Sequence, residues 1–384
     1  MVPGYEEALT KHLQKLQGRF TLHLGKKLGN ILRVPSEKLQ IPIDLLVASP
    51  PCPPWAGQGN KMSTADPRAK VFMKVVEWII FFVKCVGLLL VIIENVVGIN
   101  QVIGGNEPAI EKFLRILRTH VPEFTWAVDV ATATDYLCPQ TRTRVFLRGL
   151  RTCVASEVPS PLPAFGHRSL VDALGRFPRT PRSEFTMQQR TNIKNYEAKI
   201  RELYAAGKLN KDDLLIASID RSEGRTYKAV MSTNSAPTLT THNQYLFALQ
   251  VKEVVERVPD NERQWFRKLR DTERLTLQGF PKTLALDLKG KTRFAAGNAF
   301  PVPVIVAMLH PMLEALNTSG LDLASWPPRN MLSRKVPECV AAAAKQMKAK
   351  PRKVKTVQAR KASNVKKTTL VREALKVKKT KFML

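Results

Sequence analysis

Cys52 has the residue type and the setting of a nucleophile. It follows an apolar run at residues 43–47 and lies inside a Pro-Pro-Cys-Pro-Pro sequence that begins at Pro50. A buried strand that ends in such a turn places the thiol at the carboxyl end of a sheet, where open α/β folds hold their sites, and the prolines stiffen the loop. A lone cysteine is often only a small buried apolar residue, so its chemistry depends on partners elsewhere in the chain.

Four further segments carry polar side chains in a fixed order. A second apolar run, at residues 88–93, ends in Glu-Asn-Val at 94–96, and a Gln-x-Arg-x-Arg sequence spans 140–144. Much later come Leu-Gln-Gly-Phe-Pro at 277–281 and Gly-Asn-Ala at 297–299. Each segment alone is a weak signal, whereas all of them in this order with the Pro-Cys turn form a specific pattern.

This pattern resembles the DNA cytosine-5 methyltransferases over residues from about 5 to about 316. The resemblance implies transfer of a methyl group from the cofactor S-adenosylmethionine to C5 of cytosine in double-stranded DNA. Because C5 is a poor nucleophile, the reaction uses a covalent adduct between the Cys52 thiolate and C6 of the base. The target base must also be flipped out of the duplex, since C5 lies inside the stack.

The resemblance assigns catalytic roles to four residues, namely Cys52, Glu94, Arg142 and Arg144. Glu94 is expected to protonate or hydrogen-bond ring N3, in an apolar pocket beside Leu90 and Ile92 that stabilises the neutral acid. Alternate residues of an extended segment face the same way, so both arginines are expected to point into one cleft. The alternatives are an ordinary strand-end carboxylate and two solvated arginines at a strand edge.

By the same resemblance, Arg144 contacts the flipped base, and Arg142 contacts the catalytic loop or a phosphate. Asn95 is expected to hold the loop through backbone hydrogen bonds, and Gln140 to anchor it. The residues expected to contact DNA are Gln140, Arg142 and Thr240. Residues 55–65, which contain a Gly-Gln-Gly sequence, are expected to form a mobile lid.

The cofactor contacts implied by the resemblance come from Asn30, Ile31, Pro51, Asn298 and Ala299. Gly-Asn-Ile at 29–31 stands where the family usually has Gly-Asp-Ile, so an amide replaces the acid that contacts the adenine amino group. No metal site is expected, because the five cysteines include no Cys-x-x-Cys pair.

The composition favours a nucleic-acid partner. The chain has 384 residues and a net charge of +29, which points to a polyanion and to nucleic acid before a membrane. An apolar stretch at 71–99 is interrupted by charges, so an amphipathic helix at 69–85 is expected rather than a membrane span. Scattered cysteines indicate a reducing compartment, and we expect a monomeric nuclear protein.

The expected fold is α/β, with a doubly wound, mostly parallel sheet of the S-adenosylmethionine-dependent methyltransferase type. A small irregular target recognition domain and a disordered Lys-rich tail complete it. The expected helices lie at 5–16, 69–85, 107–119 and 301–316, and the expected strands at 21–24, 43–48, 88–93, 125–130 and 145–150. The expected divisions are a catalytic domain at 1–150 that returns at 262–325, the target recognition domain at 151–261, and a linker and tail at 326–384.

One expected part of the family pattern is missing from the sequence. No Phe-x-Gly-x-Gly cofactor loop and no acidic residue for the cofactor ribose are found, and the sequence is expected to begin just after them. Smaller departures are Pro53 where the family favours Gln, Ala56 or Gly57 where it favours Ser, and Cys138 in place of a common Gly.

The missing loop leaves several hypotheses open. The chain is a methyltransferase whose sequence lacks its true start, or an inactive relic or fragment that acts as a basic DNA-binding chromatin protein. A histone-like packaging protein does not require the catalytic pattern. A transfer-RNA methylating cousin lacks support, because the variable region has no Cys-Phe-Thr sequence.

Overall fold

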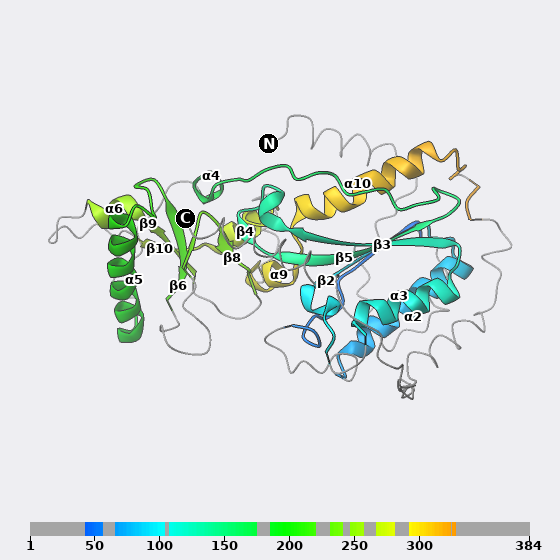
Figure 1. The fold of residues 1–384 in the computed structure, drawn as a ribbon, viewed down its shortest axis with the longest axis horizontal. Helices are drawn as coiled ribbons and strands as arrows, with labels where there is room; N and C mark the ends of the chain where they lie inside the picture. The colour runs from blue at the N-terminus through cyan, green and yellow to red at the C-terminus, as the bar shows by residue number, and fades with distance from the viewer. Residues whose placement is uncertain are drawn as a thin grey trace, which may run out of the picture.

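The computed structural model describes nine stretches of the chain, which together contain two four-stranded sheets, a two-stranded sheet and the covering helices (Figure 1). The described residues are 43–56, 66–103, 107–174, 185–219, 231–240, 246–256, 266–280, 292–323 and 325–327. The helix and strand expected at 5–16 and 21–24, and nearly all of the basic tail, lie outside them.

A four-stranded sheet in the order β1-β2-β5-β3 forms the centre of the first region. Its strands are β1 (Leu45–Ala48), β2 (Leu90–Val96), β3 (Phe124–Thr132) and β5 (Thr143–Arg151). β1 pairs with β2 in parallel, and β5 is inserted antiparallel between β2 and β3. Because β1, β2 and β3 therefore run in the same direction, the expected mostly parallel α/β sheet is confirmed, with β5 as the inverted strand.

Helices cover both faces of this sheet. α2 (Ala69–Cys85) and α3 (Ala109–His120) lie on one face, and α10 (Val302–Thr318) lies on the other (Figure 1). Side chains alternate along β2, so that Val91 and Ile93 join the core under α2 and α3 while Leu90 and Ile92 join the core under α10. A strand covered on both faces needs a continuous apolar run, which explains the sequence of β2.

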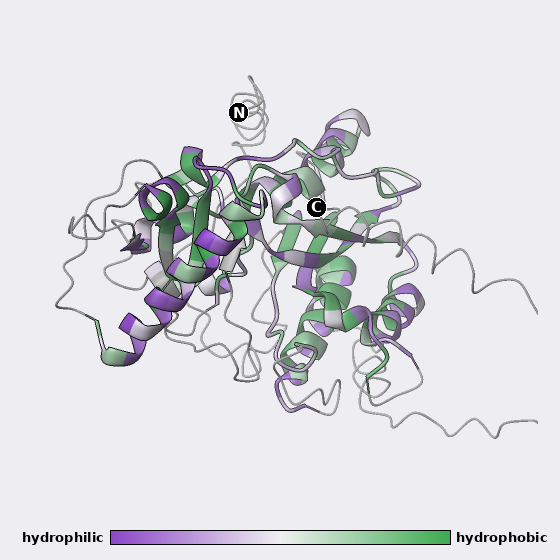
Figure 2. Ribbon diagram, turned by 60° about the vertical axis from the view of Figure 1, so that its left-hand side comes forward, coloured by the Kyte–Doolittle hydropathy of each residue, from purple (hydrophilic) through white to green (hydrophobic). Residues whose placement is uncertain are grey.

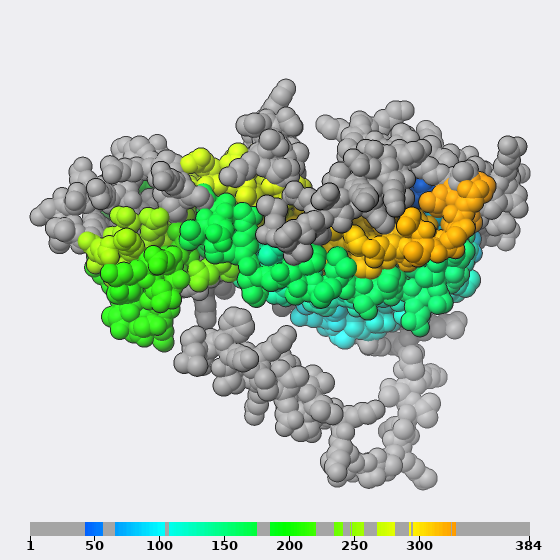
Figure 3. Space-filling view, turned by 90° about the horizontal axis from the view of Figure 1, so that it is seen from above, coloured from blue at the N-terminus to red at the C-terminus, as the bar shows by residue number. Residues whose placement is uncertain are grey.

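The sequence located these helices closely. The helix expected at 69–85 is α2 with the same bounds, the one expected at 107–119 is α3, and the one expected at 301–316 is α10. None of the helices in the described residues is long and apolar enough to cross a membrane. The chain after β5 runs along α10, where the Leu162 N–H donates to the Ala307 carbonyl at 2.9 Å (Figure 3).

The second region is built on an antiparallel sheet in the order β10-β9-β6-β7. Its strands are β6 (Leu214–Ser218), β7 (Met231–Thr233), β9 (Leu246–Gln250) and β10 (Phe266–Lys268), and its helices include α5 (Met187–Ala205) and α6 (Val251–Val255). In Figure 2 the strands are mostly hydrophobic, whereas α5 carries many hydrophilic residues.

This region is more regular than the sequence indicated, because the 19-residue helix α5 was not expected. α5 begins with a capping box in which Thr186 and Gln189 satisfy each other's backbone N–H groups. That local signal was available in the sequence. The domain boundaries at 150, 261 and 325 stay predictions.

A short parallel pair joins the two regions. β4 (Gln140–Thr141) pairs with β8 (Ala236–Pro237), and the Ala236 N–H donates to the Pro139 carbonyl at 2.6 Å. The remaining short elements are η4 (Val97–Asn100), η5 (Ala133–Asp135), α4 (Leu170–Leu174), α7 (Asp271–Thr276) and α9 (Thr292–Asn298). The joint matters for function because it lies directly before the arginine-bearing start of β5.

Candidate active site

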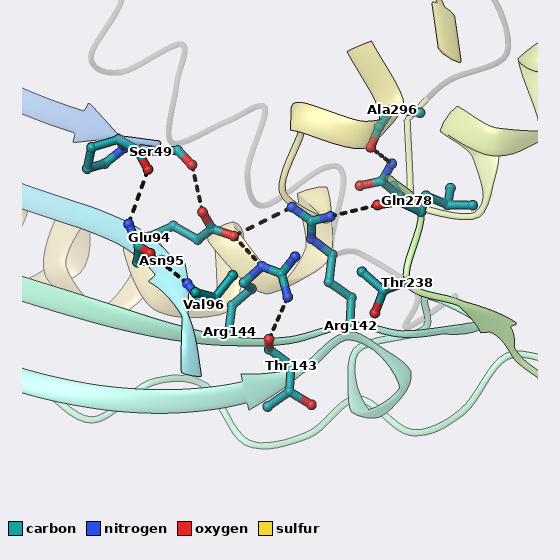
Figure 4. A network of polar contacts seen from close by, with 12 residues as sticks. Ser49, Glu94, Asn95, Val96, Arg142, Thr143, Arg144, Thr238, Gln278 and Ala296 are labelled. Carbon is teal, nitrogen blue, oxygen red and sulfur yellow. Dashed lines mark hydrogen bonds and ion pairs between the residues drawn. The ribbon is translucent and has the colours of Figure 1, made fainter. Parts of the chain in front are cut away.

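The carboxyl ends of β1 and β2 bring the Pro-Cys turn and Glu94 together. Ala48 pairs with Ile93. Ser49 and Glu94 are the next residues along the two parallel segments, so they lie side by side. The Ser49 hydroxyl donates to Oε2 of Glu94 at 2.6 Å (Figure 4). Nδ2 of Asn95 donates to the Pro50 carbonyl at 3.1 Å, which confirms the expectation that Asn95 holds this loop through a backbone group.

Cys52 lies in a tight turn whose far end is anchored in the core. The N–H groups of Trp55 and Ala56 both donate to the Cys52 carbonyl at 3.0 Å. The Trp55 side chain is only 1% exposed, and its ring packs edge-on against Phe72 and Phe113 with centroids 5.4 and 6.2 Å away. The Cys52 thiol is free and half-buried, so a rigid turn presents it without enclosing it.

The prediction of a mobile lid at 55–65 is therefore wrong for its first residue, Trp55. An aromatic side chain that packs edge-on against a stacked pair of phenylalanines does not belong to a mobile segment, because moving it removes apolar surface from the core. Residues 57–65, with both glycines of the lid, lie outside the described part of the chain.

Glu94 is buried, at 4% exposed, and charged groups surround it. Nε of Arg144 lies 3.0 Å from its Oε1, and Nη2 of Arg142 lies 3.7 Å from the same oxygen (Figure 4). The expected apolar pocket beside Leu90 and Ile92 is wrong, because the groups that contact the carboxylate are the Ser49 hydroxyl and the two guanidiniums, and Leu90 and Ile92 belong to the core under α10. The carboxylate sits beyond that core, where Ser49 and the start of β5 supply polar partners.

The two arginines face the same way, as their spacing predicted. Arg144 also donates from Nη1 to the Thr143 carbonyl at 2.7 Å, and Arg142 donates from Nη1 to the Leu239 carbonyl at 3.3 Å. Leu239 belongs to the segment after β8, so the joint between the two regions reaches into the site.

Arg142 is a buried cation with incomplete pairing. Its side chain is 5% exposed, and its Nε has no hydrogen-bond partner among the described residues. Burial lowers the pKa of Arg142 to about 10, the nearby Arg144 charge lowers it as well, and Glu94 and Cys52 act in the opposite direction. Cys52 is thus within electrostatic reach of the Arg142 guanidinium.

Gln140 anchors the loop through its backbone. Gln140 is fully buried and pairs with Ala236 in the β4–β8 ladder. The oxygen and the nitrogen of its side-chain amide both lack a hydrogen-bond partner within the described residues. Thr240 is half-buried, and its hydroxyl also lacks a partner there. The DNA contacts expected of Gln140, Arg142 and Thr240 stay predictions, and for Gln140 and Arg142 they require the covering segments to move.

Three of the residues expected to contact the cofactor are described. Pro51 and Asn298 are exposed and Ala299 is half-buried, so none of the three is closed off from a ligand, and they fit the cofactor to that extent. Asn30 and Ile31 lie outside the described residues.

Two residues of the site were not singled out from the sequence. Ser49 was missed because its contact with Glu94 depends on the register of β1 and β2. Gln278 is fully buried and donates from Nε2 to the Ala296 carbonyl at 2.5 Å. The backbone carbonyl of Gln278 accepts from the Val302 N–H at 2.9 Å, so Gln278 ties α9 to the start of α10. Its side chain lies beside Arg142 in Figure 4.

Known proteins resemble this chain over most of its length. The family model described as C-5 cytosine-specific DNA methylase matches residues 14–314. The type II methyltransferase M.MthTI of Methanothermobacter thermautotrophicus is 28% identical over 277 residues, which cover 67% of this chain and 74% of that protein. The type II methyltransferase M.HaeII of Haemophilus aegyptius is 26% identical over 277 residues, covering 71% of this chain and 75% of that protein.

Among solved structures, the Entamoeba histolytica methyltransferase EhMeth superposes with a TM-score of 0.48 and 13% identity, covering 79% of this chain and 85% of that chain.

Proposed function

The chain belongs to the C-5 cytosine-specific DNA methylase family, and from that membership we propose that Cys52, Glu94, Arg142 and Arg144 form its active site. By family the protein is a DNA (cytosine-5-)-methyltransferase. The methyl group comes from S-adenosylmethionine, the cofactor of the family. The nucleophile, the acid and the two cations around the acid come from the chain itself.

Cys52 is the proposed nucleophile. Its thiolate adds to C6 of a cytosine that has left the duplex stack, which raises the electron density at C5. Bound S-adenosylmethionine would supply the methyl group to C5, with its S–CH3 bond breaking and S-adenosylhomocysteine as the leaving group. A solvent base then takes the C5 proton, and the electron pair of the C5–H bond expels the thiolate from C6 and restores the aromatic ring. A free, half-buried thiol in a turn anchored by Trp55 supports this role.

Glu94 is the proposed acid. It gives a proton to ring N3 as the thiolate adds to C6, so that negative charge does not accumulate on the ring, and it takes the proton back when the thiolate leaves. The carboxylate formed in between lies 3.0 Å from Arg144 Nε and 3.7 Å from Arg142 Nη2, and these guanidiniums stabilise it. This convergence of both arginines on Glu94, beside the Cys52 turn, is the observation that carries the proposal.

The second region is proposed to bind DNA next to the site. The segment after β8 supplies the Leu239 carbonyl to Arg142, so the predicted target recognition region adjoins the catalytic groups. DNA as the substrate follows from the family, and that this DNA is double-stranded is part of the proposal. A nuclear location is a proposal that rests on the charge and the cysteine content, and a monomeric state is proposed as well.

The test is covalent trapping on a duplex oligonucleotide that contains 5-fluorocytosine, in the presence of S-adenosylmethionine. Fluorine at C5 blocks the last step, so an active enzyme stays attached through sulfur. We expect a denaturation-resistant, cofactor-dependent complex with the wild-type chain and with Cys153→Ala, which alters an exposed cysteine, but none with Cys52→Ala. If the wild-type chain and both variants bind DNA but none forms the complex, the protein is an inactive DNA-binding protein instead.

A further inference from the structure

Ser49 makes the shortest polar contact to Glu94. Its Oγ lies 2.6 Å from Oε2, within the range of a charge-assisted O–H···O⁻ hydrogen bond. Two fixed points hold Ser49 in place, because Ala48 before it pairs with Ile93 and Pro50 after it is bound by Asn95. The hydroxyl is therefore positioned by the sheet rather than by a flexible loop.

The two oxygens of Glu94 have different surroundings. Oε2 accepts the Ser49 hydrogen bond, whereas Oε1 makes ion pairs with Arg144 and Arg142 but has no hydrogen-bond partner of good geometry within the described residues. Oε1 is thus the oxygen with unused hydrogen-bonding capacity. A base that enters the site meets a carboxyl group with Oε2 hydrogen-bonded to Ser49 and with Oε1 ion-paired to the two arginines but still able to take a hydrogen bond.

We propose that Ser49 is a positioning residue that fixes the rotation of the Glu94 carboxyl group and so presents Oε1 to the target base. The proposal rests on the proposed role of Glu94 as the acid at N3. Ser49 suits this task in both protonation states, because Oε2 can accept its hydrogen bond both as a carboxylate oxygen and as the carbonyl oxygen of an acid protonated on Oε1. The contact therefore persists while the proton moves between Oε1 and N3.

Removing the hydroxyl frees the terminal torsion of Glu94, which is broad and has no strong intrinsic preference. Both oxygens can then turn toward the two guanidiniums, since arginine favours bidentate pairing with a carboxylate. A carboxylate held in that way is poorly placed to exchange a proton with N3. The loss appears in the chemical step and not in DNA affinity, because Ser49 acts on the base only through Glu94.

The experiment compares Ser49→Ala, Ser49→Thr and the exposed-serine control Ser156→Ala. kcat and KM for duplex DNA are measured per active site, with active sites counted by 5-fluorocytosine trapping. For Ser49→Ala we expect kcat to fall about 10-fold or more, as for loss of one hydrogen bond to a charged group, with KM within about twofold of wild type. Ser49→Thr keeps the hydroxyl and restores kcat, and Ser156→Ala matches wild type.

The outcomes separate this proposal from the proposed function. An active wild-type chain with an unchanged kcat in Ser49→Ala, or a defect that Ser49→Thr does not rescue, overturns the role of Ser49 alone. A lower count of active sites at normal kcat also overturns it, since that result indicates a folding defect. A wild-type chain that neither traps nor methylates DNA overturns the proposed function and this role with it.

Discussion

Arg148, in the middle of β5, and Arg142, just before β5, are both buried cations, yet they are paired to different degrees. Arg148 is 1% exposed, and its Nε lies 2.7 Å from Oδ2 of Asp129. It also donates to the carbonyls of Pro159 at 2.7 Å and Met308 at 3.4 Å. Arg142 has one carbonyl at 3.3 Å, one carboxylate oxygen at 3.7 Å, and an Nε without a partner among the described residues.

This difference in pairing distinguishes Arg148, a cation with a structural role, from Arg142, a cation of the candidate active site. A buried cation is tolerated when its hydrogen bonds are satisfied, and it costs stability otherwise. Arg148 ties the segment after β5 and the helix α10 to the sheet, and none of its nitrogens is among the buried side-chain atoms without a partner in the described residues. Arg142 lacks such a set of partners, which is the state expected of a group whose partner is a substrate.

The largest expected effect comes from the well-paired cation. Arg148→Met leaves Asp129 without its ion pair and removes the donor to the half-buried Pro159 carbonyl and a longer contact to the Met308 carbonyl, so we expect a loss of about 3–5 kcal/mol in the free energy of unfolding. Urea denaturation followed by circular dichroism measures it. Adding Asp129→Asn to Arg148→Met is expected to recover part of the loss, and a change below about 1 kcal/mol in the single variant contradicts the structural role.

For Arg142, the incompletely paired cation, we expect a large loss of activity and a small loss of stability. Arg142→Met is expected to reduce methyl transfer about 100-fold, as for loss of one electrostatic stabiliser of a transition state, while the free energy of unfolding stays within about 1 kcal/mol of wild type because little pairing is lost. Initial rates and urea denaturation are measured on the same preparation. A stability loss as large as that of Arg148→Met removes the distinction between the two arginines.

A smaller effect is expected at the far end of β5. Arg151 donates to the carbonyls of Val83 and Leu88, and its guanidinium lies 5.1 Å from the centroid of the Trp326 ring. Trp326→Phe removes the indole hydrogen bond to the Gly87 carbonyl, which is 2.6 Å long. We expect thermal unfolding to show a loss of about 1 kcal/mol in stability. We expect rate assays to show normal methyl transfer. A lower kcat at full occupancy of active sites contradicts a purely structural role for this end of the strand.

The smallest effect at neutral pH concerns two cysteines, and it grows only in alkaline solution. Cys138 is fully buried, and burial raises the pKa of its thiol from 9.0 to about 12. The unfolded chain ionises this thiol near pH 9 and the folded chain does not, so its contribution to stability is present below about pH 9 and is lost as the pH rises toward 12.

Alkylation of the native chain with iodoacetamide at pH 8 checks this difference. We expect the half-buried Cys52 to be modified and Cys138 to stay intact by peptide mass mapping, because a thiol that is both buried and protonated is unreactive. Rapid modification of Cys138 contradicts its burial. In Cys138→Ala the extra loss of stability above pH 9 is expected to disappear.

Local patterns in the sequence were enough to predict several parts of this protein. The apolar run of β2, the bounds of α2 and the Pro-rich turn around Cys52 follow from periodicity and from proline chemistry, and the order of the polar segments was enough to indicate the family. The spacing of Arg142 and Arg144 predicted that they face the same way, because alternation along an extended strand is a local property.

The groups that meet at the site, in contrast, depend on how distant segments pack. The contact from Ser49 to Glu94 joins residues 45 apart in the chain, and the one from Arg142 to Leu239 joins residues 97 apart. Such contacts depend on strand register, and a shift of one residue turns a side chain to the opposite face. For the same reason the burial of Trp55 and the polar surroundings of Glu94 were not evident from the local sequence around either residue.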